Sequence, residues 1–170
     1  YDIIFKIFTQ LANPINSVYQ PLLMKINSSG DEALFNKTMI RAFLYLLLLC
    51  IPVFIFVYLF QDFILINYLG FKDQETLNQL KQIIMPLAAA GFIWQIAIIA
   101  QKQLEAKDKT LMMAIVMATV VGVFSIITAL LIPKYGILAA AYTAILSSIF
   151  YLIIICLINR NENKKRILKR

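Results

Sequence analysis

The sequence predicts an all-α integral membrane protein with about five transmembrane helices. Of its 170 residues, 61% are hydrophobic and only 15% are charged. Soluble domains are about 45–50% apolar and about 25% charged. The apolar residues also gather in long blocks, and about 20 such residues suffice to cross roughly 30 Å of hydrocarbon. Lipid is therefore the expected solvent of this chain.

Four segments are both long and apolar enough to span a membrane, and a fifth, the first in the chain, is more polar. The five predicted spans cover residues 3–24, 38–60, 83–104, 110–131 and 136–158. Residues 74–82 are predicted to form a helical lead-in to the third span. Pro133 is expected to end the fourth span, and Gly136 to permit a tight turn into the fifth.

The whole chain divides into a helical bundle, residues 1–158, and a basic tail, residues 159–170. Because it starts at Tyr1 and has no basic leader before a short apolar core, we expect a segment of a longer protein. If successive loops alternate sides, twelve Lys and Arg residues lie on the side of the tail and four on the other. The positive-inside rule then places the C-terminus in the cytoplasm.

Catalytic, metal and cofactor chemistry finds little support in the residues. There is no His, the two cysteines lie in separate apolar segments, and the acids lie in loops, at span ends or in the tail. The sequence thus favours a protein that is not an enzyme and that binds no metal or cofactor. The basic tail is interpreted as a topology anchor that touches anionic membrane lipids, and nucleic acid is not an expected partner.

The first span carries a polar stripe at helical spacing. Its members are Lys6, Gln10, Asn13, Ser17 and Gln20. Amides without partners are costly in hydrocarbon, so the stripe faces either other helices or water. We favour a water-lined cavity, and Gln95 of the third span could also point inward. Pro14, Pro52 and Pro86 are candidate helix bends.

The fourth span has a face of small residues that would let helices approach closely. It consists of Ala114, Ala118, Gly122 and Ser125. We expect it to pack against the face of the last span that carries Thr143 and Ser147.

Four short motifs, in order along the chain, resemble those of the polysaccharide and O-antigen flippases. The clearest is the hairpin LIPKYGILAAAYT at 131–143, which resembles that family's "IP-x-(Y/F)-G" turn followed by a small-residue helix. The others are YQPLLMK at 19–25, INYLGF at 66–71 and QKQLEAKDK at 101–109. Together these motifs extend over nearly the whole chain.

The resemblance implies a transporter of two six-helix lobes, of which this chain forms most of one. The C-terminal lobe fits the basic tail, and the N-terminal lobe is the alternative. The implied function is alternating-access translocation of an undecaprenyl-pyrophosphate-linked oligosaccharide across the bacterial inner membrane. The resemblance then implies that the polar stripe of the first span is one wall of the substrate-binding cavity, with Gln95 as a further wall residue. Implied partners are this lipid-linked oligosaccharide, the missing lobe and the polysaccharide polymerase machinery. A multidrug or cation exporter, a lipid II flippase and a non-transport membrane scaffold are the alternatives.

Overall fold

The computed structural model describes residues 2–68, 70 and 73–167, without the side chains of 2–4, 68 and 164–167. Helices make up almost all of this part, and it contains no strand. The elements are α1 (Asp2–Ser29), α2 (Glu32–Leu59), α3 (Gln61–Phe63), the π-helical turn η1 (Ile64–Tyr68), α4 (Gln74–Glu105), α5 (Thr110–Tyr135) and α6 (Ile137–Ile167). Residues 168–170 of the predicted tail, and Leu69 and Phe71 of the INYLGF motif, lie outside the described residues.

Four of these helices are long and apolar enough to cross a membrane, namely α2, α4, α5 and α6. The predicted all-α membrane fold is thereby confirmed, and the helices suit a multi-pass membrane protein. The first predicted span, residues 3–24, lies in α1, which has 28 residues but does not reach the apolarity of the other four helices. Its crossing of the membrane stays a prediction.

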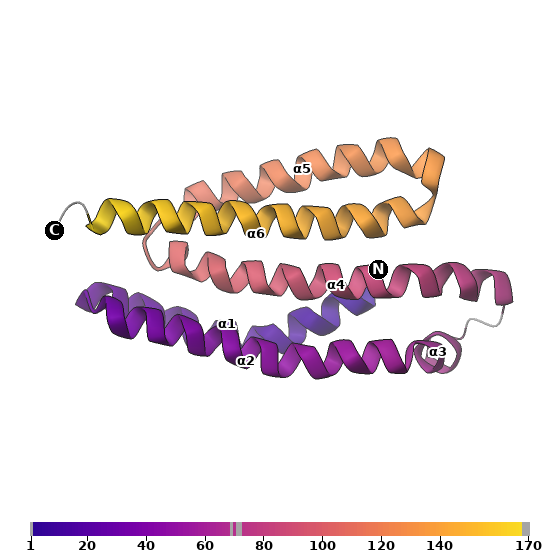
Figure 1. Ribbon diagram of the computed structural model, residues 1–170, viewed down its shortest axis with the longest axis horizontal. Coiled ribbons are helices and arrows are strands. Elements are labelled where there is room, and N and C mark those ends of the chain that lie inside the picture. The colour runs from indigo at the N-terminus through magenta and orange to yellow at the C-terminus, as the bar shows by residue number, and fades with distance from the viewer. Residues whose placement is uncertain (1, 69, 71–72, 168–170) are drawn as a thin grey trace.

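The helices form a flat bundle with α4 at its centre. Figure 1 shows α1 and α2 along one side of α4, and α6 followed by α5 along the other. Helix α4 packs on α1, α2 and α6, whereas α5 packs mainly on α6. The main core cluster accordingly joins residues of α1, α2 and α4, and a second joins α4, α5 and α6.

Helix α1 approaches α4 closely because a glycine lies at the contact. Phe8 and Ala12 of α1 are fully buried. A Cβ atom on Gly91 would lie 3.1 Å from Cδ2 of Phe8 and 3.6 Å from Cδ2 of Phe5. The missing side chain therefore leaves the room that the Phe8 ring occupies.

Helices α2 and α4 both begin in polar segments of the chain. The lead-in 74–82 is helical as predicted, since α4 begins at Gln74. Only Gly30 and Asp31 separate α1 from α2, so most of the polar segment 25–37 is helix. An Asp side chain caps the N-terminus of each helix. The Asp31 carboxylate accepts from the Leu34 N–H, and the Asp73 carboxylate accepts from the Thr76 N–H. These caps allow α2 and α4 to begin in polar residues before their apolar spans.

The cap of α4 predicts a pH effect on stability. The Thr76 hydroxyl and N–H donate to Asp73 at 2.7 and 2.9 Å, and these bonds lower the pKa of Asp73 below 3.8. Because the pKa of Asp73 is lower in the folded protein than in the unfolded chain, the cap stabilises the fold at pH values above the unfolded-state pKa. This stabilisation is lost as the pH falls through the folded-state pKa. Asp73→Ala should lower the melting temperature at pH 7, and the difference from wild type should shrink below pH 3.8.

Asp73→Asn is the matched control for this prediction. Asn caps helices about as well as Asp but does not titrate in this range. The variant should therefore stay close to wild type at pH 7 and gain on it in acid. A constant difference between Asp73→Ala and wild type over the whole pH range would contradict the role of the carboxylate.

The prediction that Pro133 ends the fourth span was wrong. Helix α5 continues through Pro133 to Tyr135, and Gly136 ends it with φ at +62°. The Gly136 N–H donates to the Ile132 carbonyl at 2.8 Å. Proline removes one helical hydrogen bond near the end of α5, but the chain reverses only where glycine permits a positive φ.

The expected packing of the small-residue face of α5 on α6 was wrong for three of its four residues, whereas the fourth, Ser125, lines one groove with Thr143 and Ser147. Ala114, Ala118 and Gly122 are exposed, and no atom lies within 4 Å of a Cβ built on Gly122. Helix α5 instead buries Met113 and Val120, which belong to the core cluster shared with α4 and α6. Larger side chains on the adjoining face thus decide which side of α5 meets its neighbours.

Candidate functional site

The polar residues of α1 form two rows along the helix. Lys6, Gln10, Asn13 and Ser17 are exposed, and we call them the outer row. Ser17 Oγ donates to the Asn13 carbonyl at 2.9 Å within the helix. Within the described part of the chain, the side-chain amides of Gln10 and Asn13 have no hydrogen-bond partner. The outer row therefore does not bond α1 to a neighbouring helix through these two amides.

The other row joins α1 to α4, and we call it the seam. Gln95 Nε2 donates to Thr9 Oγ1 at 3.1 Å, and Lys102 Nζ donates to Gln20 Oε1 at 3.0 Å. Asn27 Nδ2 donates to the carbonyl of Ala106 at 2.7 Å. These contacts are hydrogen bonds across a packed helix pair, as polar residues in membrane bundles often make.

The predicted cavity residues are thus separated by the fold. Lys6, Gln10, Asn13 and Ser17 share the outer face of α1, whereas Gln20 turns toward α4. Gln95 is only 3% exposed. Both glutamines bond across the seam, which gives each a structural role. A role of the outer row in substrate binding stays a prediction.

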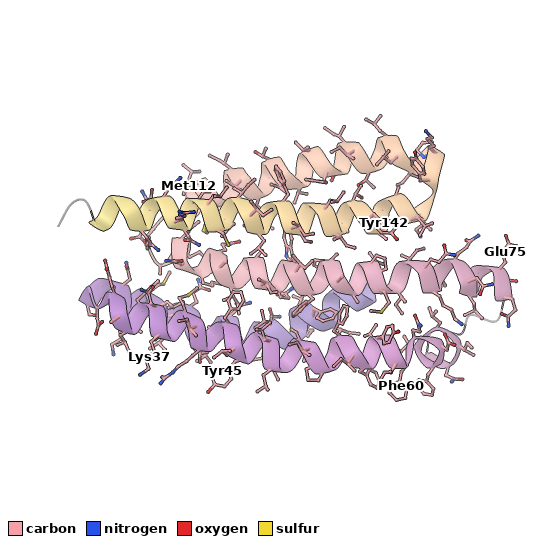
Figure 2. The ribbon with its side chains drawn as sticks, viewed as in Figure 1. Lys37, Tyr45, Phe60, Glu75, Met112 and Tyr142 are labelled. Carbon is pink, nitrogen blue, oxygen red and sulfur yellow. The ribbon has the colours of Figure 1, made fainter. Side chains whose placement is uncertain are left out.

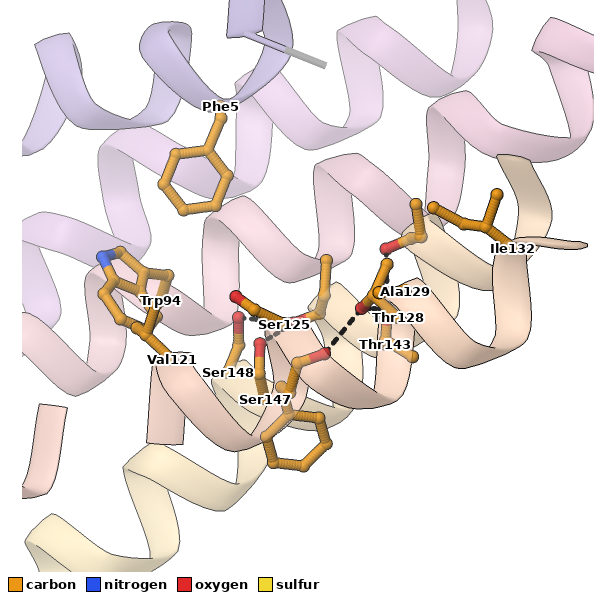
Figure 3. Close-up of a pocket in the computed structure, with 13 residues that line it drawn as sticks. Phe5, Trp94, Val121, Ser125, Thr128, Ala129, Ile132, Thr143, Ser147 and Ser148 are labelled. Atoms are coloured by element: carbon orange, nitrogen blue, oxygen red, sulfur yellow. Dashed lines mark hydrogen bonds between the residues drawn. The ribbon is translucent and has the colours of Figure 1, made fainter. Parts of the chain in front are cut away.

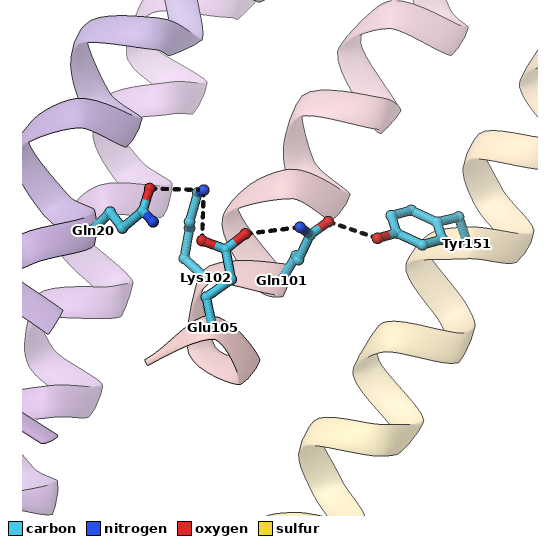
Figure 4. A network of polar contacts seen from close by, with 5 residues as sticks. All are labelled: Gln20, Gln101, Lys102, Glu105 and Tyr151. Atoms are coloured by element: carbon cyan, nitrogen blue, oxygen red, sulfur yellow. Dashed lines mark hydrogen bonds and ion pairs between the residues drawn. The ribbon is translucent and has the colours of Figure 1, made fainter. Parts of the chain in front are cut away.

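A chain of polar contacts crosses the bundle at the end of α4, and Figure 4 shows its five residues. Lys102 Nζ lies between Gln20 of α1 and Glu105 Oε2, which is 2.8 Å away. Gln101 Nε2 donates to Glu105 Oε1 at 2.8 Å, and Tyr151 of α6 donates to Gln101 Oε1 at 2.6 Å. The Lys102 and Glu105 side chains are only 13% and 11% exposed.

This network ties three helices together around a nearly buried ion pair. The Glu105 carboxylate accepts from two donors on its own helix, and the chain extends to α1 on one side and α6 on the other. A buried ion pair is tolerated when further hydrogen bonds satisfy its atoms, as they do here. We expect the network to hold α1 and α6 in fixed positions against α4.

A groove lies between α5 and α6 and faces α1 and α4. Its volume is about 510 Å³. Figure 3 shows Phe5 and Trp94 on one side and a group of hydroxyls on the other. The hydroxyls are those of Ser125, Thr128, Thr143, Ser147 and Ser148. The Thr128 and Thr143 hydroxyls lie 2.7 Å apart and join α5 to α6.

Trp94 connects the groove to the polar network. Its ring stacks on Tyr151, with centroids 5.1 Å apart, and lies 6.3 Å from the Phe5 ring. Tyr151 is fully buried and donates to Gln101. Trp94 therefore contacts both the lining of the groove and a residue of the network.

The three prolines that were predicted to bend helices all lie inside helices of the structure. Pro14 lies in α1, Pro52 in α2 and Pro86 in α4, and each helix continues past its proline. Each proline leaves the carbonyl four residues earlier without its usual helical donor. Among the described residues, no group of three His, Cys, Asp or Glu side chains is placed to hold a metal ion.

Sequence reasoning missed Glu105 and the hydroxyl groove. In the sequence, Glu105 counted only as one of the acids in loops and at span ends, although Gln101 and Lys102 lie four and three residues before it, the spacing of interacting helical side chains. The hydroxyls of 125, 143 and 147 were interpreted as packing residues. The pairing of α5 with α6 was expected from the sequence, but the spacing did not show that these hydroxyls would line an open groove between the two helices.

Comparison of the chain with protein-family models, with curated proteins and with solved structures finds no match.

Proposed function

We propose that this chain forms part of a membrane transporter for a lipid-linked oligosaccharide. The observation that carries the proposal is the outer row of α1. Lys6, Gln10, Asn13 and Ser17 are exposed on a helix whose opposite face is packed in the bundle. Hydrocarbon cannot solvate an amide or an ammonium group, so this face is expected to meet water or a polar ligand.

Other exposed surfaces of the bundle differ in chemistry. Helices α2 and α5 expose large apolar side chains such as Leu48, Leu111 and Leu130, and Figure 2 shows side chains along both helices that point away from the bundle. Such surfaces suit contact with acyl chains, whereas the outer row suits an aqueous cavity. This contrast favours a transporter over a membrane scaffold, because a scaffold surrounded by lipid needs no exposed polar row.

The chemistry of the row fits a glycosylated pyrophosphate. Amides exchange hydrogen bonds with sugar hydroxyls, and the Lys6 ammonium is suited to a pyrophosphate oxygen. The hydroxyls of the groove offer further donors and acceptors. The likeness of the four motifs to polysaccharide flippases supports a substrate carried on undecaprenyl pyrophosphate. It also supports a location in the inner membrane with a cytoplasmic C-terminus. A second lobe and a polymerase would then be the protein partners.

Cysteine labelling tests whether the outer row meets water. The two native cysteines, Cys50 and Cys156, are first replaced by alanine. Membranes that contain the Asn13→Cys or the Ser17→Cys variant of this protein are then treated with a charged, membrane-impermeant thiol reagent. Both positions should be labelled, because thiols react as thiolates, which form in water. Ile126→Cys and Leu130→Cys are the controls, since both native side chains are exposed on α5.

The control positions should stay unlabelled in lipid and react only after detergent is added. Labelling of Ile126→Cys at the rate of Asn13→Cys would show that exposure alone governs the reaction. Failure of both outer-row positions to react would place this face in lipid or against another helix, and the transport proposal would lose its support.

A further inference from the structure

A second groove is lined by α2, α4 and α6. Helices α2 and α6 flank α4, as Figure 1 shows. The groove has a volume of about 470 Å³. Met39 and Phe43 line it from α2, Ala100 and Gln103 from α4, and Cys156, Asn159, Arg160 and Asn163 from α6.

The lining changes from apolar to polar along α6. Cys156 shares the lining with the apolar side chains of Met39 and Phe43, and Arg160 and Asn163 follow it one and two turns later on α6. A neighbouring hollow of about 340 Å³ shares Met39 and Phe43 and adds Ile40 and Leu44. The apolar part of the groove therefore continues over the outer face of α2, in a region where acyl chains would lie.

The polar end of the groove is held in place and carries positive charge. Asn163 Oδ1 accepts from Lys107 Nζ at 2.6 Å and from Gln103 Nε2 at 3.3 Å. Arg160 is exposed, and within the described part of the chain its guanidinium makes no hydrogen bond or ion pair. Helix α6 continues to Ile167 and its sequence adds Lys164, Lys165 and Arg166.

We propose that this groove binds one anionic phospholipid, with its phosphate at Arg160 and an acyl chain along Met39 and Phe43. The apolar part of the groove suits an acyl chain, and the cation at its polar end suits the phosphate of the same lipid. Basic pockets between membrane helices bind anionic headgroups in this way. The guanidinium can donate two parallel hydrogen bonds to phosphate oxygens. This site is independent of the outer row of α1 and goes beyond the proposed transport function.

Melting of the purified full-length protein in a neutral detergent tests the site. Phosphatidylglycerol should raise the melting temperature, because a ligand of the folded state stabilises it. Phosphatidylcholine, which has no net charge, and glycerol phosphate, which has no acyl chain, should produce little or no rise. In Arg160→Gln, the half-saturating amount of phosphatidylglycerol should increase about fivefold, the effect of one cation near a lipid headgroup.

Two further variants decide the outcome. Lys37→Gln removes an exposed cation of α2 that lines neither hollow, and it should respond to phosphatidylglycerol as wild type does. Cys156→Phe should fill the apolar part and abolish the rise without any change of charge. No rise in wild type, an equal rise with phosphatidylcholine, or an unchanged response of both Arg160→Gln and Cys156→Phe would overturn the proposal.

Discussion

Replacing Glu105 by alanine is expected to lower the free energy of unfolding by about 3 kcal/mol. The change leaves the Lys102 ammonium nearly buried with Gln20 as its remaining partner, and it removes the acceptor of the Gln101 amide. An unpaired charge in such surroundings costs far more than the loss of an exposed pair, which is about 0.3–0.5 kcal/mol on a helix. Equilibrium unfolding in mixed detergent micelles measures the difference.

The double variant Lys102→Met, Glu105→Leu is the control. It removes both charges together, so it should recover most of the stability that Glu105→Ala loses. A loss of about 0.5 kcal/mol or less in Glu105→Ala would show that solvent already screens the pair. An equally large loss in the double variant would assign the effect to packing at the end of α4.

Replacing Gln10 and Asn13 together by leucine is expected to slow transport about thirtyfold at an unchanged melting temperature. Two neutral hydrogen bonds to a ligand contribute about 2 kcal/mol, which corresponds to that factor. Stability should persist because neither amide bonds to another helix within the described residues. The measurement is export of the glycan by cells that depend on the variant, normalised to the amount of protein in the membrane.

Two single variants on the same helix separate binding from packing. Val18 is 63% exposed but lies outside the outer row, so Val18→Leu should transport normally. Gln20→Leu should lower the melting temperature, because it removes the hydrogen bond to Lys102. Normal export by the Gln10 and Asn13 double variant would contradict a role of the outer row in transport.

The fold was predictable to the extent that it depends on local sequence. Runs of apolar residues located the four apolar helices, and the polar lead-in 74–82 was recognised. The helix ends were predicted less well. Pro133 is a strong breaker in soluble helices, but so close to the end of α5 it removes one bond without stopping the helix, and the positive φ of Gly136 is what reverses the chain.

The candidate site was predictable only in part, because helical spacing identifies a face but not its neighbour. The sequence showed the polar stripe of α1 as a single face. In the structure, α4 covers Gln20, whereas Asn13 is exposed in the described part of the chain. The division depends on how α4 lies across α1, which involves contacts between residues about 80 positions apart. The small-residue face of α5 was assigned to packing for the same reason, and the structure leaves it exposed.

The seam between α1 and α4 also has a consequence for biosynthesis. Its three hydrogen bonds join residues that are 79, 82 and 86 positions apart in the chain. A ribosome adds about 5–20 residues per second, so α4 follows α1 by on the order of ten seconds. Lipid offers no partner for the Gln20 amide during that interval, whereas the Thr9 hydroxyl keeps its bond to the Phe5 carbonyl. Helix α1 is therefore expected to stay in a hydrated site of the insertion machinery until α4 emerges, whereas the apolar α5 can enter the bilayer alone.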